Sequence, residues 1–202
     1  MEIVIATKNK KKLEEIKEIW KELDLKLISL ADFPGTPRII ENGKTFKENA
    51  IKKAVKTARF TKRLTMGEDS GLCVDALGGK PGVYSSRFSG KGKFDSKNNF
   101  KVLKLLKVVP LKKRKAHYIS AVAFADAHGL VGVAQGRCDG IIGFEPKGTF
   151  GFGYDPLFVI PKYKKTFAQL GGRIKHSMSH RYRALEKAKR ILEKYIEKHK
   201  SG

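Results

Sequence analysis

The order of apolar and polar positions along the chain predicts alternating strands and helices. Residues 2–6 form a short apolar segment that indicates a buried strand. Across residues 8–23 the apolar side chains recur three or four positions apart, which is the spacing of a helix with one buried face. These side chains are Leu13, Ile16, Ile19, Trp20 and Leu23.

The same patterns continue to the end of the chain. Thr45 precedes a helical pattern and Glu48 follows three positions later, the spacing of a capping box. Gly129 separates two segments rich in small and β-branched residues, which predicts a hairpin. We expect an α/β protein with a mixed sheet, because the order of elements is too irregular for a doubly wound fold. The remaining predicted strands are 25–30, 64–69, 115–126, 130–138 and 157–160, the helices are 45–62, 97–107 and 179–199, and the long loops are 31–43 and 77–96.

Length and composition favour one globular domain over residues 1–202, since the chain is long enough to bury a core and 41% of its residues are hydrophobic. No apolar run reaches the ~20 residues of a membrane-spanning helix, and no signal peptide is evident. Cys73 and Cys138 have neither zinc-ligand spacing nor partners for a disulfide framework. The expected compartment is the cytoplasm.

The net charge of +23 suits a polyanionic partner or a heavily solvated surface. The chain has 33 Lys and only 10 Arg, spread over its whole length without a basic tail. Arginine is the residue favoured for bidentate phosphate contacts, and lysine for general solvation. We therefore favour solvation and do not expect nucleic acid as a partner, although the charge attracts any phosphorylated substrate.

A polar segment follows the first predicted strand and opens the first helix. Backbone N–H groups at a helix N-terminus attract anions, and Thr, Asn and Lys side chains strengthen that attraction. An ordinary helix cap with a solvated face explains the same residues. The candidate phosphate-binding residues are Thr7, Lys8, Asn9, Lys10, Lys11 and Lys12.

Glu68 and Asp69 end the strand predicted over 64–69, and Glu41 lies in the preceding loop. Carboxylate oxygens are suited to Mg²⁺, and one carboxylate can instead activate water. The alternative is an acidic turn with no chemistry. An acidic cluster is notable here because basic residues outnumber acidic ones by 43 to 20.

A candidate base-binding region lies nearer the end of the chain. Phe152 is flanked by glycines and is followed by Asp155, while His180 and Arg181 begin the last predicted helix and Lys175 precedes them. An aromatic ring can stack on a flat base, and charged side chains can read its edge. A capped helix with nearby charges is the simpler explanation of His180 and Arg181 taken alone. A glycine-rich loop at 77–87 is open to both a phosphate-covering and a purely structural interpretation.

Taken together, these blocks resemble the inosine triphosphate pyrophosphatase family, the XTP/dITP diphosphohydrolases. The blocks span almost the whole chain in the family's order, which is more specific than any one of them. They are Ala6-Thr7-x-Asn9-x-x-Lys12-x-x-Glu15, Glu41, Thr45-Phe46-x-Glu48-Asn49-Ala50-x-x-Lys53-Ala54, Glu68-Asp69-Ser70-Gly71-Leu72, Gly78-Gly79-x-Pro81-Gly82-Val83-Tyr84-Ser85, Gly151-Phe152-Gly153-Tyr154-Asp155-Pro156 and Ser179-His180-Arg181-x-x-Ala184-Leu185.

The resemblance implies a homodimer whose protomer has an elongated mixed sheet flanked by helices, and two lobes with an active-site cleft between them. It implies Mg²⁺-dependent hydrolysis of ITP, dITP and XTP to the monophosphate and pyrophosphate, which removes deaminated purines from the nucleotide pool. Asp69 is then the general base, a metal ligand or both, with Glu41 and Glu68 as metal ligands. The implied substrate-binding residues are Thr7 to Lys12, Lys53 and Ser70 at the phosphate side, and Phe152, Gly153, Tyr154, Asp155, Lys175, His180 and Arg181 at the base.

One segment departs from the family pattern. Gly171, Gly172 and Arg173 stand where members usually carry acidic residues before the lysine that corresponds to Lys175. Two other functions stay open at this point. One is a related pyrophosphatase that prefers modified pyrimidine triphosphates, and the other is a nucleic-acid-binding protein without catalysis.

Overall fold

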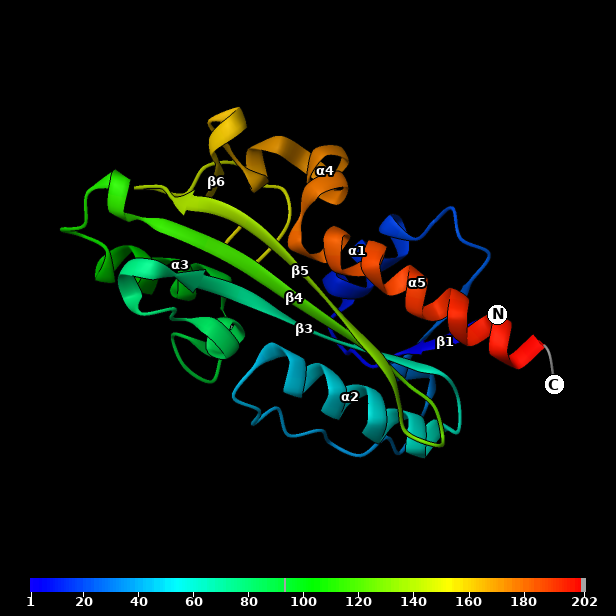
Figure 1. Cartoon of the computed structure of the whole chain (residues 1–202). Coiled ribbons are helices and arrows are strands. Elements are labelled where there is room, and N and C mark those ends of the chain that lie inside the picture. The colour runs from blue at the N-terminus through cyan, green and yellow to red at the C-terminus, as the bar shows by residue number, and fades with distance from the viewer. Residues whose placement is uncertain (93, 201–202) are drawn as a thin grey trace. The chain divides into compact units, whose positions relative to one another are not determined.

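The computed structural model describes residues 1–92 and 94–200, which form helices and strands in the order drawn in Figure 1. The strands are β1 (Glu2–Ile5), β2 (Lys26–Ser29), β3 (Thr65–Val74), β4 (Lys115–Ala125), β5 (Leu130–Ile142), β6 (Phe158–Ile160) and β7 (Lys165–Thr166). The α-helices are α1 (Lys10–Ile19), α2 (Phe46–Thr61), α3 (Asp95–Leu105), α4 (Phe167–Met178) and α5 (His180–Lys200).

The seven strands make one sheet in the order β2-β1-β3-β4-β5-β6-β7. The pairs of β1 with β2 and with β3 are parallel, whereas β6 is antiparallel to both of its neighbours. The sheet is therefore mixed and is flanked by helices, which confirms the α/β class expected from the sequence.

The chain divides into two compact units. Unit 1 comprises Met1–Asp69, Ser120–Gly136 and His180–Gly202, and unit 2 comprises Ser70–Ile119 and Arg137–Ser179. Strands β3, β4 and β5 each contribute residues to both units. A single domain over 1–202, and a cleft between two lobes, stay predictions.

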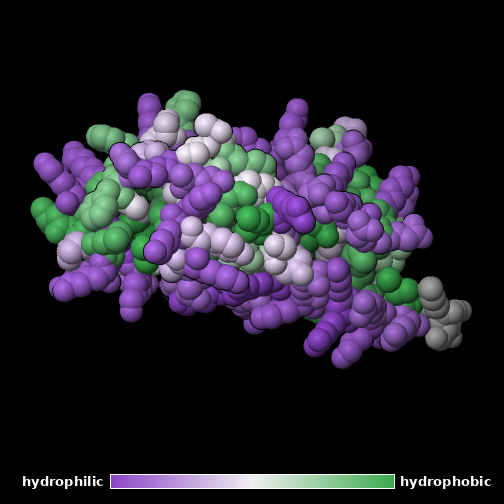
Figure 2. All heavy atoms as spheres, turned by 90° about the horizontal axis from the view of Figure 1, so that it is seen from above, coloured by the Kyte–Doolittle hydropathy of each residue, from purple (hydrophilic) through white to green (hydrophobic). Residues whose placement is uncertain are grey.

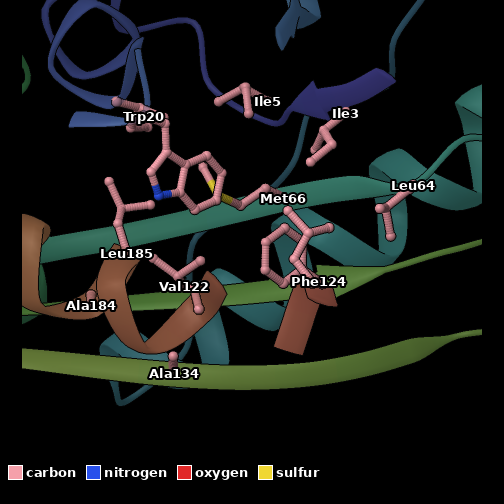
Figure 3. Packing of buried hydrophobic residues seen from close by; sticks show 13 residues of the cluster. Ile3, Ile5, Trp20, Leu64, Met66, Val122, Phe124, Ala134, Ala184 and Leu185 are labelled. Atoms are coloured by element: carbon pink, nitrogen blue, oxygen red, sulfur yellow. The ribbon is translucent and has the colours of Figure 1, made fainter. Parts of the chain in front are cut away.

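In unit 1, helices lie on both faces of the strands. Helices α1 and α5 lie on one face and α2 on the other (Figure 1). The side chains of Ile3 and Ile5 on β1, and of Leu64 and Met66 beside and on β3, join the cluster under α1 and α5. Figure 3 shows Leu185 of α5 and Trp20, which directly follows α1, among these strand residues. The period of two along each strand explains why alternate residues share this face.

Helix α2 packs closely against the opposite face of β3. Gly67 is buried there, and a Cβ at this position would lie 2.3 Å from the carbonyl oxygen of Ala50. Ala50, Ala54 and Ala58 are fully buried along the inward side of α2. Small residues on both elements thus allow the helix backbone to approach the strand, which brings the side chains of α2 to the polar residues of β3.

Unit 2 has its own core. Tyr118, Phe158 and Phe167 pack their rings together, with the centroids of Tyr118 and Phe158 4.6 Å apart. Leu72 of β3 and Val102 of α3 lie in the same cluster and are fully buried. Helix α3 and strands β3 to β6 are therefore anchored around one aromatic centre.

The structure differs from the sequence-based expectation in three places. Strand β3 does not end at the acidic pair but continues to Val74, because Leu72 and Val74 are buried in the core of unit 2. Helix α4, which contains Lys175 and is kinked at Gly171, was not among the predicted helices. Thr45 does cap α2, but the carboxylate of Glu48 accepts the N–H of Lys44 and not that of Thr45.

Hydrophilic side chains cover most of the face drawn in Figure 2, with hydrophobic ones between them. Within residues 1–92 and 94–200, no helix is long and apolar enough to cross a membrane.

Candidate functional site

Unit 1 contains a polar cluster centred on Lys53, in which Lys53, Asn49 and Asp69 are buried and Glu41 is exposed. The ammonium of Lys53 on α2 donates to Asp69 Oδ1 at 3.0 Å and to Glu41 Oε2 at 2.8 Å. Asn49, one turn earlier on α2, donates to Asp69 Oδ2 at 3.1 Å, and its own Oδ1 accepts the N–H of Gly43. The structure thus brings together three predicted site residues, Glu41, Lys53 and Asp69. Asn49, which was not predicted, lies beside them.

Glu68 belongs to a second cluster in the same unit. Its Oε2 accepts from Lys12 Nζ at 2.8 Å, and its Oε1 accepts from Ser120 Oγ at 2.9 Å and Arg181 Nη2 at 3.1 Å. Arg181 also forms an ion pair with Glu15 of α1. A fully buried guanidinium is therefore held between two carboxylates, and Glu68 is tied to α1, β4 and α5.

The two neighbouring carboxylates point to opposite sides of β3. Glu68 faces the side of α1 and α5, and Asp69 faces α2, as the alternation of side chains along a strand requires. Among residues 1–92 and 94–200, no group of three or more His, Cys, Asp or Glu side chains forms a metal-binding cluster. Glu41 and Asp69 meet at Lys53, and Glu15 and Glu68 meet at Arg181.

The pKa values of Asp69 and Glu68 are shifted in opposite directions. Burial raises the pKa of Asp69 above its ordinary value, and the nearby charge of Lys53 only partly opposes this. Burial also acts to raise the pKa of Glu68, but the charges of Arg181 and Lys12 outweigh it and hold that pKa well below the ordinary value. Asp69 is thus the carboxylate better able to take up a proton, whereas Glu68 stays charged.

Glu41 and Lys53 each stabilise the charged form of the other. Burial acts to raise the pKa of Glu41, but Lys53 brings it below its ordinary value. Burial acts to lower the pKa of Lys53, but Asp69 and Glu41 raise it above its ordinary value. The cluster therefore contains a fixed cation between two carboxylates, of which only Asp69 is favoured to protonate.

The predicted phosphate-binding segment joins β1 to α1. Asn9 is the N-cap of α1, and its Oδ1 accepts the N–H of Lys12 at 3.2 Å. Thr7 Oγ1 accepts the N–H of Asn9 at 3.1 Å. Lys12 turns inward to Glu68, whereas the side chains at 8, 10 and 11 are exposed. The segment thus carries three exposed lysines, Lys8, Lys10 and Lys11, at the N-terminal end of a helix.

In unit 2, a tight turn presents the ring of Phe152. Asp155 Oδ2 accepts the N–H of Phe152 at 2.8 Å and the ammonium of Lys175 at 2.6 Å. That ammonium lies 5.0 Å from the centroid of the Phe152 ring. The structure therefore brings together Phe152, Asp155 and Lys175, a ring with a cation beside it and a buried carboxylate that positions both.

Glycine and α3 shape this turn. Gly151 has φ of +82°, and a Cβ there would lie 2.2 Å from Asp155 Oδ2. The N–H of Gly153 donates to Asp95 and its carbonyl accepts from Asn99, both on α3. Both the N–H and the carbonyl of Gly153 are thus held by α3, which fixes the turn.

The other predicted residues are placed as follows. Tyr154 is buried and its hydroxyl donates to the carbonyl of Ser85 at 2.7 Å, so the geometry favours a structural role. Ser70 is half-buried on β3. His180 and Arg181 are buried at the start of α5, and their contact with a base stays a prediction.

Sequence reasoning assigned no role to Asn49, Ser120 or Glu15. A buried asparagine on the apolar side of a predicted helix is a usable signal for Asn49, because such a side chain needs hydrogen-bond partners. Glu15 likewise lies next to the apolar position Ile16 on α1 and is buried. Nothing in the pattern around Ser120 indicated its contact with Glu68.

Comparison with known proteins covers both units. A profile of the Ham1 family matches residues 3–191. The dITP/XTP pyrophosphatase of Desulforamulus reducens is 49% identical over 192 residues, which are 95% of this chain and 96% of that protein. The Ham1 protein structures from Coxiella burnetii and Staphylococcus aureus have TM-scores of 0.86 and 0.85 at 38% and 35% identity. Each covers 96% of this chain, and the matches include 99% and 100% of those chains, respectively. The fold is thus shared along almost the whole chain, and the chain belongs to the Ham1 family.

Proposed function

We propose that this protein is a dITP/XTP pyrophosphatase that hydrolyses ITP, dITP and XTP to the nucleoside monophosphate and pyrophosphate. The observation that carries the proposal is the contact of the buried residues Asp69, Lys53 and Asn49 with one another, and of Lys53 with the exposed Glu41. The name of the relative from Desulforamulus reducens supports the substrate class.

Asp69 serves as the general base. Its pKa is raised by burial, so it takes a proton from water more readily than an exposed aspartate. The water oxygen forms a bond to the α-phosphorus, the bond from that phosphorus to the bridging oxygen breaks, and pyrophosphate leaves. Asn49 and Lys53 hold the two oxygens of Asp69 and so orient the carboxylate.

The donor set suits Mg²⁺. Glu41 and Asp69 present hard oxygen atoms, and Mg²⁺ is usually held by one or two carboxylates with phosphate oxygens and water completing its shell. A bound Mg²⁺ supplies positive charge to the phosphates. Glu68 is the third proposed metal ligand, although Lys12, Ser120 and Arg181 hold it on the side of β3 opposite to Asp69 in this structure.

The remaining residues bind the substrate at its two ends. Lys53 and the segment from Thr7 to Lys12 contact the triphosphate. Ser70, which directly follows Asp69 in the sequence, contacts the substrate at the same side. Phe152 stacks on the base, and Lys175 donates to a carbonyl at position 6 of hypoxanthine or xanthine, where adenine has an amino group. Leaving a buried donor unpaired disfavours the wrong base. His180 and Arg181 are the further proposed residues at the base edge.

The test is turnover of ITP, XTP, dITP, GTP, ATP, CTP and UTP with and without Mg²⁺, with pyrophosphate and orthophosphate measured separately. We expect pyrophosphate from ITP, dITP and XTP with little from ATP or GTP. Orthophosphate as the first product would place the attack at the γ-phosphorus and refute the mechanism. Preference for pyrimidine triphosphates would refute the assignment of the base site.

The proposal includes a homodimer in the cytoplasm. Sedimentation velocity of the full chain tests the first part, and a monomer at micromolar concentration would contradict it.

A further inference from the structure

We propose that the exposed side of α3 and the loop before it form a binding surface for single-stranded nucleic acid. This surface, called the α3 surface below, lies wholly within unit 2 and is separate from the residues assigned to catalysis. It departs from the expectation that nucleic acid is not a partner. Its residues are Tyr84, Arg87, Phe88, Lys91, Phe94, Lys97, Phe100, Lys101 and Lys104.

Charge is the first observation. From residue 80 to residue 115 the chain has 12 basic residues and one acidic residue. That acidic residue, Asp95, is engaged because its carboxylate accepts the N–H of Gly153 at 2.8 Å. In the part of the chain that the structure describes, no ion pair neutralises Lys97, Lys101 or Lys104, which recur along one side of α3. The surface therefore carries a local excess of positive charge that attracts a polyanion.

Exposed aromatic rings are the second observation. Tyr84, Phe94 and Phe100 are 59%, 54% and 69% exposed. Rings of this size normally contribute to a core or an interface when several occur together. The ring of Phe94 lies close to Gly92, where an added Cβ would be 2.3 Å from it.

The rings and the cations are interleaved. Lys97 Nζ lies 4.8 Å from the centroid of Phe94, Lys101 Nζ 4.5 Å from that of Phe88, and the guanidinium carbon of Arg87 5.2 Å from that of Tyr84. Proteins that bind single strands combine a basic track for the backbone with aromatic rings on which unpaired bases stack. A duplex has no free base faces, so the exposed rings favour single strands.

The α3 surface is a poor match for two other partners, a second copy of the chain and an anionic lipid surface. Two copies of a surface with this excess of lysine repel each other, which disfavours self-association through it. An anionic lipid surface would satisfy the lysines but offers nothing flat to stack on the rings. The opposite side of α3 is occupied, because Asp95 and Asn99 hold Gly153.

The experiment is fluorescence anisotropy of the full chain with labelled 20-nucleotide poly(dT) and poly(rU) and with a DNA duplex of equal length, over a series of salt concentrations. We expect both single strands to bind at least about tenfold more tightly than the duplex. Preference for poly(dT) or poly(rU) identifies the source of the strand.

Two variants separate the contributions of charge and stacking. The triple variant Lys97→Gln, Lys101→Gln, Lys104→Gln should weaken binding about tenfold or more and reduce the salt slope by about 2, since each phosphate contact contributes about 0.7 to the slope for single strands. Phe100→Ala should weaken binding about tenfold with the salt slope unchanged. The matched control is Lys187→Gln, Lys194→Gln, Lys198→Gln on the exposed side of α5, which removes the same charge and should change affinity less than twofold.

Four outcomes would overturn the proposal: equal losses in the two triple variants, no effect of Phe100→Ala, duplex binding as tight as single-strand binding, and tighter binding to phosphatidylserine vesicles than to poly(dT). Sedimentation of the same variants adds a further test. A dimer that dissociates on Phe100→Ala without any oligonucleotide binding would assign the surface to self-association instead. Turnover of ITP by the triple variant should match the unmodified chain, which separates this proposal from the proposed enzymatic function.

Discussion

Asp69 and Glu68 are adjacent in the chain, yet their surroundings give them different chemistry. Asp69 meets one cation and an amide, whereas Glu68 meets two cations and a hydroxyl. Because burial raises the pKa of Asp69 and cations lower that of Glu68, we assign proton uptake to Asp69. At the scale of single residues, the partner of each carboxylate determines its role.

Replacing Asp69 by Asn should lower kcat about 10²- to 10⁴-fold, the usual contribution of a general base, while nucleotide binding persists. Steady-state turnover of ITP and equilibrium binding of a non-hydrolysable analogue measure the two effects. Asp139→Asn is the control, because Asp139 lies in an exposed ion pair with Arg137. Near-normal turnover by the Asp69 variant would remove its assignment as base.

The pH dependence of turnover should follow the protonation of Asp69. The base is active when deprotonated, so kcat/KM should fall as the pH decreases through its raised pKa. Lys53 lowers that pKa, and Lys53→Met should therefore move the acidic limb of the profile to higher pH. Lys52→Met is the control, since Lys52 bonds to Asn42 instead. A limb that stays in place, or moves to lower pH, would contradict the assignment.

Phe152→Ala should mainly raise KM for ITP, because it removes the ring on which the base is proposed to stack and leaves the phosphate side unchanged. Phe144→Ala is a matched control, as Phe144 is an exposed ring in the same unit and has no assigned role. Kinetic constants that do not change would exclude stacking on Phe152.

At the scale of elements, close contact between α2 and β3 brings Lys53 and Asn49 to Asp69. Gly67→Ala should push α2 away from the strand, since its Cβ would meet the Ala50 carbonyl at 2.3 Å. We expect a loss of about 1–3 kcal/mol in the free energy of unfolding, the usual cost of overpacking, together with reduced turnover. Gly143→Ala is the control, because its nearest neighbour would be 3.5 Å away. Equal stability of the two variants in urea would show that this contact is not tight.

At the scale of the whole molecule, three strands carry the chain from one unit into the other. Residues of β3, β4 and β5 belong to both cores, so we expect the two units to unfold together. Trp20, the single tryptophan, reports on unit 1, and the buried thiols of Cys73 and Cys138 report on unit 2. Fluorescence and thiol labelling should therefore give the same midpoint in urea, and two separate midpoints would refute the expectation.

Several features were predictable because their causes are local. The hydrophobic spacing of residues 8–23 and 45–62, the cap at Thr45 and the small and β-branched residues around Gly129 predicted α1, α2 and the hairpin of β4 and β5. Helix α4 was missed since two glycines interrupt its pattern, and Gly171 does kink it. The end of β3 was misjudged because Glu68 and Asp69 resemble a turn, although cations from distant elements allow both carboxylates to be buried within a strand.

The sequence by itself determined the class of fold, the family and the types of side chain available to the site, because periodicity, caps and motif spacing are properties of short segments. Only the tertiary structure decided which charges meet. Arg181 is 113 residues from Glu68 and 166 from Glu15 along the chain, and no local pattern encodes contacts at such separation. The exposure of Phe100 was decided in the same way, since a ring on a helix is buried or exposed according to what packs against that helix.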